Sequence, residues 1–327
     1  MHKKKYTSLK TSTAGAHDAV STQQCVILRY CRVAQLCHDP LQLAVEPYRF
    51  EDHMQYLTET CNVISLTELT RHVKEKRPFP HRTVALTFDY GYRDVRDVVM
   101  PVLDSFALPA TVFVPTANMV EHRCFWWDEL EDLVIVEHER NEIELDIDGR
   151  FHHWSLANPS ERFGAFESLM AIFNCKPPWQ QRELLDVLHE VVDTTTGDRD
   201  NHRTLTAQDL MDLERTSLMS VGGYTHHAAA LDSLSACQQV CEIGKNKRAL
   251  EEVLEHEVIW FSHPWNNGGS GPDVAGMLQM LGYKFGLGSN YGTVDAERPI
   301  DRYDLPRVKA PNCNAFGFHQ FLSRFFA

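Results

Sequence analysis

The chain has 327 residues, of which 43% are hydrophobic and 24% are charged, and its formal net charge is -13 at pH 7. This length and composition are those of a folded protein with a large hydrophobic core. The acidic balance argues against a nucleic-acid partner, because phosphate binding requires clustered lysine and arginine. The sequence contains no apolar run of about eighteen residues, so it predicts no membrane-spanning segment.

The first 24 residues, MHKKKYTSLKTSTAGAHDAVSTQQ, begin basic and lack the apolar segment of a secretory signal. Their polar composition predicts a disordered tail. Without an export signal we expect a cytoplasmic protein whose nine cysteines are reduced thiols. The one close pair, Cys237 and Cys241, has no histidine pattern around it and does not indicate a zinc site.

Strands and helices are predicted to alternate after the tail. An apolar run over 25–33 is typical of a strand, and apolar residues over 46–60 recur at helical spacing. A buried strand over 84–88, a helical pattern after it and a further strand over 111–116 continue the alternation. This order predicts an α/β fold, with a parallel sheet and crossover helices.

Residues 118–205 interrupt this alternation, and we interpret them as an insertion within one domain that spans 25–327. A helix is predicted over 125–136, where we expect two tryptophans to pack the insertion. A hairpin is predicted over 143–154, because apolar residues alternate around an Asp-Gly turn. The alternation then resumes with two strands and two helices, in the order 218–224, 236–256, 258–266 and 273–282.

The stretch VALTFDYGYRD, residues 84–94, carries the strongest indication of function. An apolar strand ends here at an acid, Asp89, and a glycine turn follows. Proteins with α/β barrels and open α/β sheets keep their catalytic residues at the carboxyl ends of the strands. Asp89 is therefore the first candidate for a catalytic role.

The order of segments resembles that of the polysaccharide deacetylase superfamily, also known as NodB-homology proteins or carbohydrate esterase family 4. The segments that carry the resemblance, over about residues 25–310, are ILRYCRV, RFEDHMQYL, VALTFDYGYRD, MPVLDSFALPATVFVPT, FWWDELEDL, SVGGYTHHAAALDSLS, FSHPWN and YDLPRV. The chain looks most like the soluble members that occur among surface-glycan biosynthesis proteins. The resemblance implies an irregular (β/α) barrel whose site lies at the C-terminal ends of the strands.

The resemblance also implies an activity, the hydrolysis of N-acetyl groups from amino sugars with a divalent metal. In that chemistry the metal polarises the amide carbonyl and its bound water, and a carboxylate acts as general base. The family's first block reads Thr-Phe-Asp-Asp-Gly, in which the first acid is the base and the second is a metal ligand. Asp89 matches the base, whereas Tyr90 stands at the ligand position.

The other site positions of the family are also changed. Its second block, Gly-His-Thr-x-x-His-Pro, supplies two histidine ligands. When the chain is aligned through Thr225, those positions hold Tyr224 and Ala228. A further family histidine, which assists the leaving amine, corresponds to Cys31. Of these five expected site residues, the resemblance leaves Asp89 alone unchanged.

These replacements bear on the cofactor. A neutral tyrosine is a poor ligand for a hard divalent ion, and alanine offers no ligand atom at all. One carboxylate is not expected to hold Zn²⁺, Co²⁺ or Ni²⁺ in competition with water. The sequence therefore predicts no metal and no other cofactor, in a protein that keeps the family's frame around a repurposed or emptied pocket.

Several of the candidate residues allow two interpretations. Asp89 could be a base with a raised pKa, or it could anchor the turn after its strand. His226 and His227 could rebuild a relocated metal site, or they could be loop histidines with ordinary hydrogen bonds. His263 could be a general acid or base, or a structural hydrogen-bonding group. Cys31 could be a buried apolar residue or, if a base lay beside it, a nucleophile.

Three aromatic residues, Tyr90, Tyr224 and Trp265, could form a floor on which a sugar ring packs, or they could simply fill the cleft. We predict Asp89 and His263 as the catalytic candidates. The predicted substrate-binding residues are Cys31, Tyr90, Tyr224, Thr225, His226, Ala228 and Trp265.

The leading hypothesis is a metal-free member of the family that binds an amino-sugar glycan, a nucleotide sugar or a lipid-linked sugar, or that serves a partner enzyme of glycan biosynthesis. The alternative is an active hydrolase that removes an N-acetyl or N-formyl group from an amino sugar. It would use a relocated metal, or Asp89 and His263 without metal. A third class is an interaction protein that docks through the acidic segment 128–145, which could equally be a solvated surface.

Overall fold

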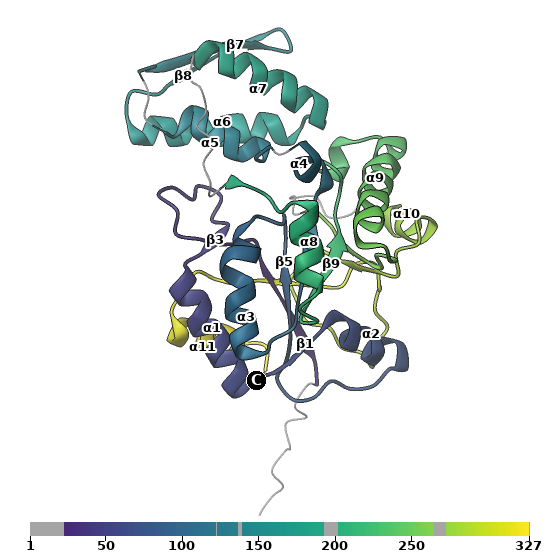
Figure 1. The fold of residues 1–327 in the computed structure, drawn as a ribbon. Coiled ribbons are helices and arrows are strands. Elements are labelled where there is room, and N and C mark those ends of the chain that lie inside the picture. The colour runs from purple at the N-terminus through teal and green to yellow at the C-terminus, as the bar shows by residue number, and fades with distance from the viewer. Residues whose placement is uncertain (1–22, 122, 137–138, 193–201, 265–272, 327) are drawn as a thin grey trace, which may run out of the picture.

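The computed structural model describes residues 23–121, 123–136, 139–192, 202–264 and 273–326 (Figure 1). Of the predicted tail, only Gln23 and Gln24 belong to the described residues, so the prediction of disorder stays a prediction. None of the helices in these ranges is long and apolar enough to cross a membrane.

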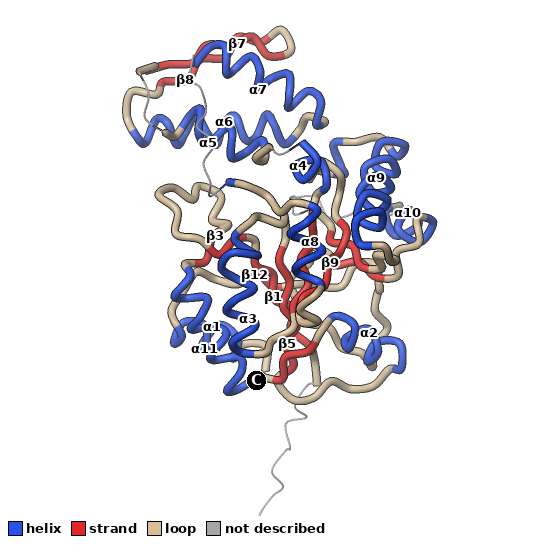
Figure 2. Tube along the Cα trace, viewed as in Figure 1, coloured by secondary structure: helices blue, strands red, loops and turns tan. Residues whose placement is uncertain are grey.

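A curled parallel sheet forms the centre of the structure (Figure 2). Neighbouring strands in it are paired in parallel throughout. The predicted α/β class with a parallel sheet is therefore confirmed, in the form of an irregular (β/α) half-barrel. In spatial order its strands are β11 (Phe285–Leu287), β10 (Trp260–Ser262), β9 (Met219–Gly223), β6 (Ala110–Val114), β5 (Thr83–Phe88), β1 (Cys25–Tyr30) and β12 (Val308–Lys309), with β4 (Asn62–Ile64) also paired to β5.

Helices cover the outer face of this sheet. In chain order they are α1 (Pro47–Thr60), α2 (Leu66–Glu75), a π-helical turn (Val95–Val99) that continues as α3 (Met100–Phe106), α8 (Ala207–Glu214), α9 (Ala236–Leu254), α10 (Val274–Met280) and α11 (Ala315–Ser323). The predicted helices and strands are present with shifted ends. The largest difference is the strand predicted over 258–266, which is confined to β10, and residues 265–266 lie outside the described residues.

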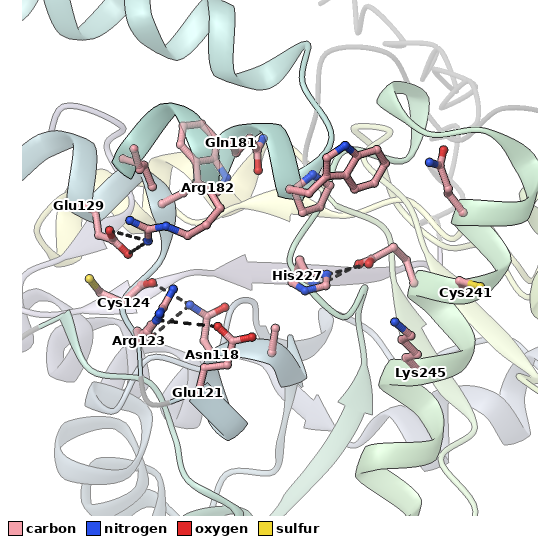
Figure 3. Close-up of a pocket in the computed structure, with 17 residues that line it drawn as sticks. Asn118, Glu121, Arg123, Cys124, Glu129, Gln181, Arg182, His227, Cys241 and Lys245 are labelled. Carbon is pink, nitrogen blue, oxygen red and sulfur yellow. Dashed lines mark hydrogen bonds and ion pairs between the residues drawn. The ribbon is translucent and has the colours of Figure 1, made fainter. Parts of the chain in front are cut away.

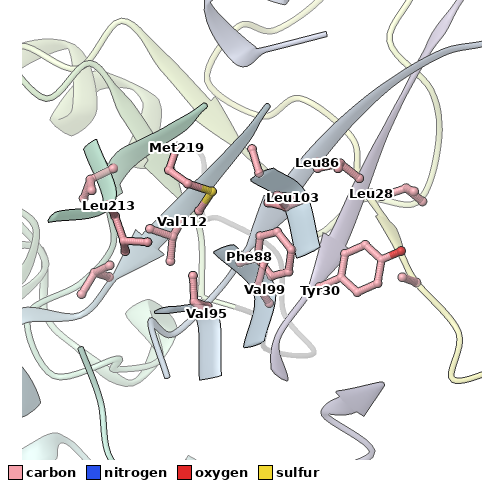
Figure 4. Close-up of a cluster of buried hydrophobic side chains, with 14 of the residues drawn as sticks. Leu28, Tyr30, Leu86, Phe88, Val95, Val99, Leu103, Val112, Leu213 and Met219 are labelled. Atoms are coloured by element: carbon pink, nitrogen blue, oxygen red, sulfur yellow. The ribbon is translucent and has the colours of Figure 1, made fainter. Parts of the chain in front are cut away.

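Both faces of the central strands are buried, which explains why they are read as continuous apolar runs. Along β1 and β5, alternate residues such as Leu28 and Leu86 belong to one hydrophobic cluster, which also contains Val99 and Leu103 (Figure 4). The intervening residues, such as Ile27, belong to a second cluster inside the curl of the sheet. Because side chains alternate along a strand, Arg29 and Asp89 continue this inward set.

The segment between β6 and β9 contributes a group of elements with its own hydrophobic cluster. We call the part from α5 to α7 the lobe, and it lies at the top of Figure 1. The predicted hairpin is confirmed, with Ile143 opposite Trp154, and Asp148 and Gly149 both adopt positive φ at its turn. After the short α4 (Thr116–Glu121), the lobe consists of α5 (Trp126–Val134), β7 (Glu142–Ile147), β8 (Arg150–Ser155), α6 (Pro159–Asn174) and α7 (Pro178–Val192).

A small parallel pair flanks the end of β1. It joins β2 (Arg32–Val33) to β3 (Ala44–Val45) and folds the intervening loop back over the carboxyl end of the sheet. A single turn of 3-10 helix (Leu231–Ser233) precedes α9.

The close approach of two backbones at β11 gives a test of this fold. A Cβ added at Gly286 would overlap the carbonyl oxygen of Tyr303, which cannot move aside as a flexible side chain can. We expect Gly286→Ala to lower the free energy of unfolding by about 1–3 kcal/mol, measured by urea denaturation. Gly276→Ala is the matched control, because nothing lies within 4 Å of a Cβ there. In helix α10 that change should be neutral or stabilising by up to about 1 kcal/mol, and equal effects of the two variants would contradict the packing described.

Candidate active site

Asp89 is the centre of the candidate site. It follows β5 directly, its backbone N–H donates to the carbonyl oxygen of Tyr30 at 2.9 Å, and its side chain is completely buried. Ser262 Oγ, at the end of β10, donates to Asp89 Oδ1 at 3.1 Å. The acid that the sequence singles out therefore lies inside the curl of the sheet at the carboxyl ends of its strands.

Two buried arginines form ion pairs with Asp89. Arg307 Nη1 donates to Asp89 Oδ1 at 2.8 Å, and Arg29 Nη1 lies 3.7 Å from Oδ2. The side chains of Arg307 and Asp89 are 0% exposed and that of Arg29 is 2% exposed. Two guanidinium groups thus surround one carboxylate in a dry environment, where a charge is tolerated only when it is paired.

Neither arginine was among the predicted site residues. Arg29 could have been recognised from its place within the apolar run CVILRYCRV. A charged residue at a buried position of a strand requires a partner of opposite charge. Arg307 lies in the segment YDLPRV, which supported the family resemblance without being assigned a role. Sequence periodicity could place Arg29 on a strand but could not identify the carboxylate that it faces.

Tyr90 and Tyr224 lie side by side next to Asp89. Their ring centroids are 5.7 Å apart at an interplanar angle of 62°, an edge-to-face contact. Tyr90 adopts φ 74°, a left-handed conformation that directs the chain into the glycine turn. Burial raises the pKa of both phenols above its ordinary value, so both are neutral near pH 7.

The donor atoms at these positions do not fit the divalent metal that the family resemblance implies. Tyr90 and Tyr224 offer neutral phenol oxygens, and Ala228 offers no ligand atom. The one carboxylate, Asp89, is already paired with two guanidinium groups. Among the described residues, the side chains spaced closely enough to share a metal are Asp128, Glu131 and His202. They lie elsewhere, beside Tyr92, whose hydroxyl donates to Asp128 at 2.9 Å.

The tyrosine pair forms part of the wall of a cleft of about 530 Å³. Trp126 and Trp127 of α5 line the same cleft, and the Trp127 ring lies 5.2 Å from that of Tyr90. We call it the aromatic cleft, and its other lining residues include Leu43, Asn174, Gln181, Ala228, Asp232 and Pro264. The two tryptophans that are expected to pack the insertion therefore also line this cleft.

The two neighbouring histidines are both held by hydrogen bonds. His226 Nδ1 lies 2.8 Å from Thr116 Oγ1, and burial lowers its pKa. His227 Nδ1 lies 2.7 Å from Glu242 Oε1, and its backbone N–H donates to the same carboxylate. His227 lines a second cleft, of about 750 Å³, between α4, α7 and α9 (Figure 3). This arrangement matches the interpretation of loop histidines with ordinary hydrogen bonds.

His263 is not brought together with Asp89. Its Nε2 lies 2.8 Å from the carbonyl oxygen of Tyr303, and its ring packs edge-on against Phe261 at 5.2 Å. The preceding residue, Ser262, is the one that reaches Asp89. Consecutive residues of an extended chain point to opposite sides, so His263 faces away from the carboxylate.

The structure gives no reactive role to the remaining predicted site residues that it describes. Cys31 is 2% exposed and burial raises the pKa of its thiol, which keeps it neutral. Thr225 is completely buried, and Ala228 adopts φ 55° in the turn after β9. Trp265 lies outside the described residues.

Comparison with known proteins agrees with this architecture. A family model described as polysaccharide deacetylase matches residues 76–161, a range that includes Asp89 and Tyr90. No curated protein matches the sequence significantly.

Solved structures resemble the chain in fold. The deacetylase PplD of Streptococcus pyogenes, solved in complex with acetate, is 17% identical, with a TM-score of 0.59 over 93% of this chain and 98% of that one. IcaB from Ammonifex degensii is 15% identical, with a TM-score of 0.58 over 93% and 97%. BC0361, a polysaccharide deacetylase from Bacillus cereus, is 13% identical, with a TM-score of 0.57 over 92% and 69%. At these identities the likeness is one of fold.

The buried ion pairs predict a strong and non-additive effect on stability. Asp89→Asn removes the one carboxylate between Arg29 and Arg307, so we expect it to lower the free energy of unfolding by about 3–5 kcal/mol. The double variant Asp89→Asn/Arg29→Met should lose clearly less than the sum of the two single variants, because it no longer buries two unpaired cations. Chemical denaturation of the three proteins measures this coupling.

The control is the exposed pair of Arg77 and Glu75. Glu75→Gln should change the free energy of unfolding by no more than about 0.5 kcal/mol. Strictly additive losses at Asp89 and Arg29 would contradict an energetic link between them.

Buried histidines predict a fall in stability at acid pH. Burial lowers the pKa of His263 from 6.5 to about 4, and that of His53 to about 4 as well. The unfolded chain therefore takes up these protons at higher pH than the folded protein does. The contribution of these two neutral histidines to the free energy of unfolding is fully present above pH 6.5. It is lost as the pH falls towards 4, by up to about 3 kcal/mol for each group.

His263→Gln, which can still donate to Tyr303, should make this fall shallower in denaturation measured between pH 7 and 4. His256→Gln is the control, because the side-chain hydrogen bond to Glu214 raises the pKa of His256 instead. An unchanged pH profile in His263→Gln would show that folding does not lower the pKa of this imidazole.

Proposed function

We propose that this chain, a member of the polysaccharide deacetylase superfamily, binds an amino-sugar glycan or sugar precursor in the aromatic cleft and does not perform metal-dependent deacetylation. The single observation that carries the proposal is the pair of neutral phenols, Tyr90 and Tyr224, whose rings pack against each other beside Asp89. These two tyrosines stand where the family resemblance expects an acid and a histidine that bind metal.

The composition of the cleft wall supports a carbohydrate ligand. Sugar rings present C–H groups on their faces and hydroxyl groups at their edges, so aromatic walls with a few polar side chains suit them. Tyr90, Trp126 and Trp127 provide the aromatic surface, and Asn174 and Asp232 are polar groups in the same wall. A volume of about 530 Å³ is within the usual range for a small-molecule site.

The surroundings of Asp89 argue against the family's hydrolytic step. A general base must reach the water or proton on which it acts, whereas this carboxylate is completely buried and already accepts hydrogen bonds from Ser262 and Arg307. A metal would contribute several kcal/mol of transition-state stabilisation, and the neutral phenols beside Asp89 are poor ligands for one.

Binding is tested with N-acetylglucosamine oligosaccharides and their de-N-acetylated forms, by isothermal titration calorimetry. We expect Trp126→Ala to weaken binding about fivefold to tenfold through the loss of one aromatic wall. Trp179→Ala is the matched control, because Trp179 is an exposed tryptophan of α7 that lines the second cleft and not the aromatic cleft.

The same ligands test catalysis. Wild-type protein supplied with Zn²⁺, Co²⁺ or Ni²⁺ should release neither acetate nor formate from N-acyl amino sugars, and its melting temperature should not rise with metal concentration. Release that is abolished by Asp89→Asn would overturn the proposal in favour of an active hydrolase. Failure of every amino-sugar ligand to bind would remove the carbohydrate-binding role.

A further inference from the structure

The aromatic cleft has one acidic side chain in its wall among the described residues. This side chain is Asp232, in the single turn of 3-10 helix that precedes α9. No lysine, arginine or histidine of the described part of the chain lines the cleft. An aromatic wall and one carboxylate are therefore combined there, and the described lining provides no cation to balance the acid.

The carboxylate of Asp232 is available to a ligand. Asp232 is exposed, and within the described ranges its side chain has no ion pair and no hydrogen bond. The turn that carries it is firmly held, because Gln239 Nε2 donates to the carbonyl oxygens of Leu231 and Leu234 at 2.6 and 3.1 Å. The backbone thus fixes the place of this acid and leaves both of its oxygens open to a partner.

Packing also holds the aromatic wall of the cleft in place. The Trp127 ring stacks on Phe125 at 4.5 Å, and its Nε1 donates to Tyr92 Oη at 2.8 Å. The Trp126 ring stacks on Phe173 at 5.2 Å. The face of an aromatic ring attracts a cation, and tryptophan attracts it most strongly. A cationic ligand would therefore interact favourably with both the aromatic and the acidic part of this cleft.

The charge of the whole chain favours the same kind of ligand. A formal net charge of -13 attracts cations from solution. Arg29 and Arg307 act on the pKa of Tyr224 but do not line the cleft, and both form ion pairs with Asp89. A neutral ligand that covered Asp232 would remove water from the carboxylate without supplying a positive charge in its place.

We infer that the aromatic cleft selects the de-N-acetylated form of an amino sugar, whose free ammonium group pairs with Asp232 while the sugar ring packs on the tryptophans. This inference rests on the proposed function and names its class of ligand. An acetyl group removes the positive charge of the amine, so the acetylated sugar loses both the ion pair and the attraction of the cation to the aromatic rings. Asp232 is thus the residue that determines specificity.

The test is isothermal titration calorimetry of the full chain with the tetrasaccharide of N-acetylglucosamine and with its fully de-N-acetylated form. At about pH 6 the free amine is charged, because an amine of this kind titrates near pH 8, as an α-amino group does. At low ionic strength we expect the de-N-acetylated form to bind about threefold to tenfold more tightly. Added salt should reduce this preference.

Two substitutions at Asp232 test its role. Asp232→Asn should bind the two tetrasaccharides with equal affinity, and Asp232→Glu should retain the preference. Asp146→Asn is the matched control, because Asp146 is an exposed aspartate of β7 that lines neither the aromatic cleft nor the second cleft. It changes the net charge by the same amount and should keep the preference of the wild type.

The possible outcomes separate this inference from the proposed function. Equal or tighter binding of the N-acetylated form, a preference that survives in Asp232→Asn, or one that is lost in Asp146→Asn would overturn the inference and leave the proposed function standing. Binding of ethylamine as tight as that of the de-N-acetylated tetrasaccharide would also overturn it, since the cleft would then recognise an ammonium group without a sugar. Failure of both tetrasaccharides to bind would remove the proposed function and this inference with it.

Discussion

The candidate site is organised around the buried ion pairs of Asp89 with Arg29 and Arg307. Asp89 follows β5, Arg29 lies on β1, and Arg307 directly precedes β12, so the pairs connect three segments that are distant in sequence. Ser262 adds a hydrogen bond from the end of β10. In a dry interior each of these charges depends on the others, because removing one partner leaves the rest desolvated and uncompensated. The bonds to this one carboxylate therefore help to fix the ends of four strands, β1, β5, β10 and β12, at the site.

The aromatic cleft lies next to these ion pairs, since Tyr90 of its wall directly follows Asp89. The charge of the Asp89 carboxylate is compensated by guanidinium groups that come from the chain itself. The neighbouring positions hold Tyr90 and Tyr224, two neutral phenols whose rings pack against each other. Trp127 of the lobe completes the aromatic surface by packing against Tyr90.

The clefts around the site differ in chemistry because they are built from different elements. The aromatic cleft combines strand ends with α5 and α6, and its walls suit the faces of sugar rings. The second cleft lies between α7 and α9, and ion pairs such as that of Arg182 with Glu129 give it a balanced polar lining (Figure 3). A third cleft, of about 480 Å³, adjoins the ion pairs from the side of β2, β3 and β12, and its lining includes Arg29, Asp39 and Lys309.

The sequence alone determined the α/β class, the succession of strands and helices, the hairpin of the lobe and the position of Asp89 at the end of a strand. These features depend on local periodicity and turn chemistry, which neighbouring residues specify. The tertiary structure alone decided which side chains meet. Arg307 is 218 residues from Asp89, and no local pattern connects them. The tertiary structure also decided that Ser262 and not His263 faces the carboxylate. Neighbouring residues of a strand point to opposite faces of the sheet, so a shift of one residue exchanges their places.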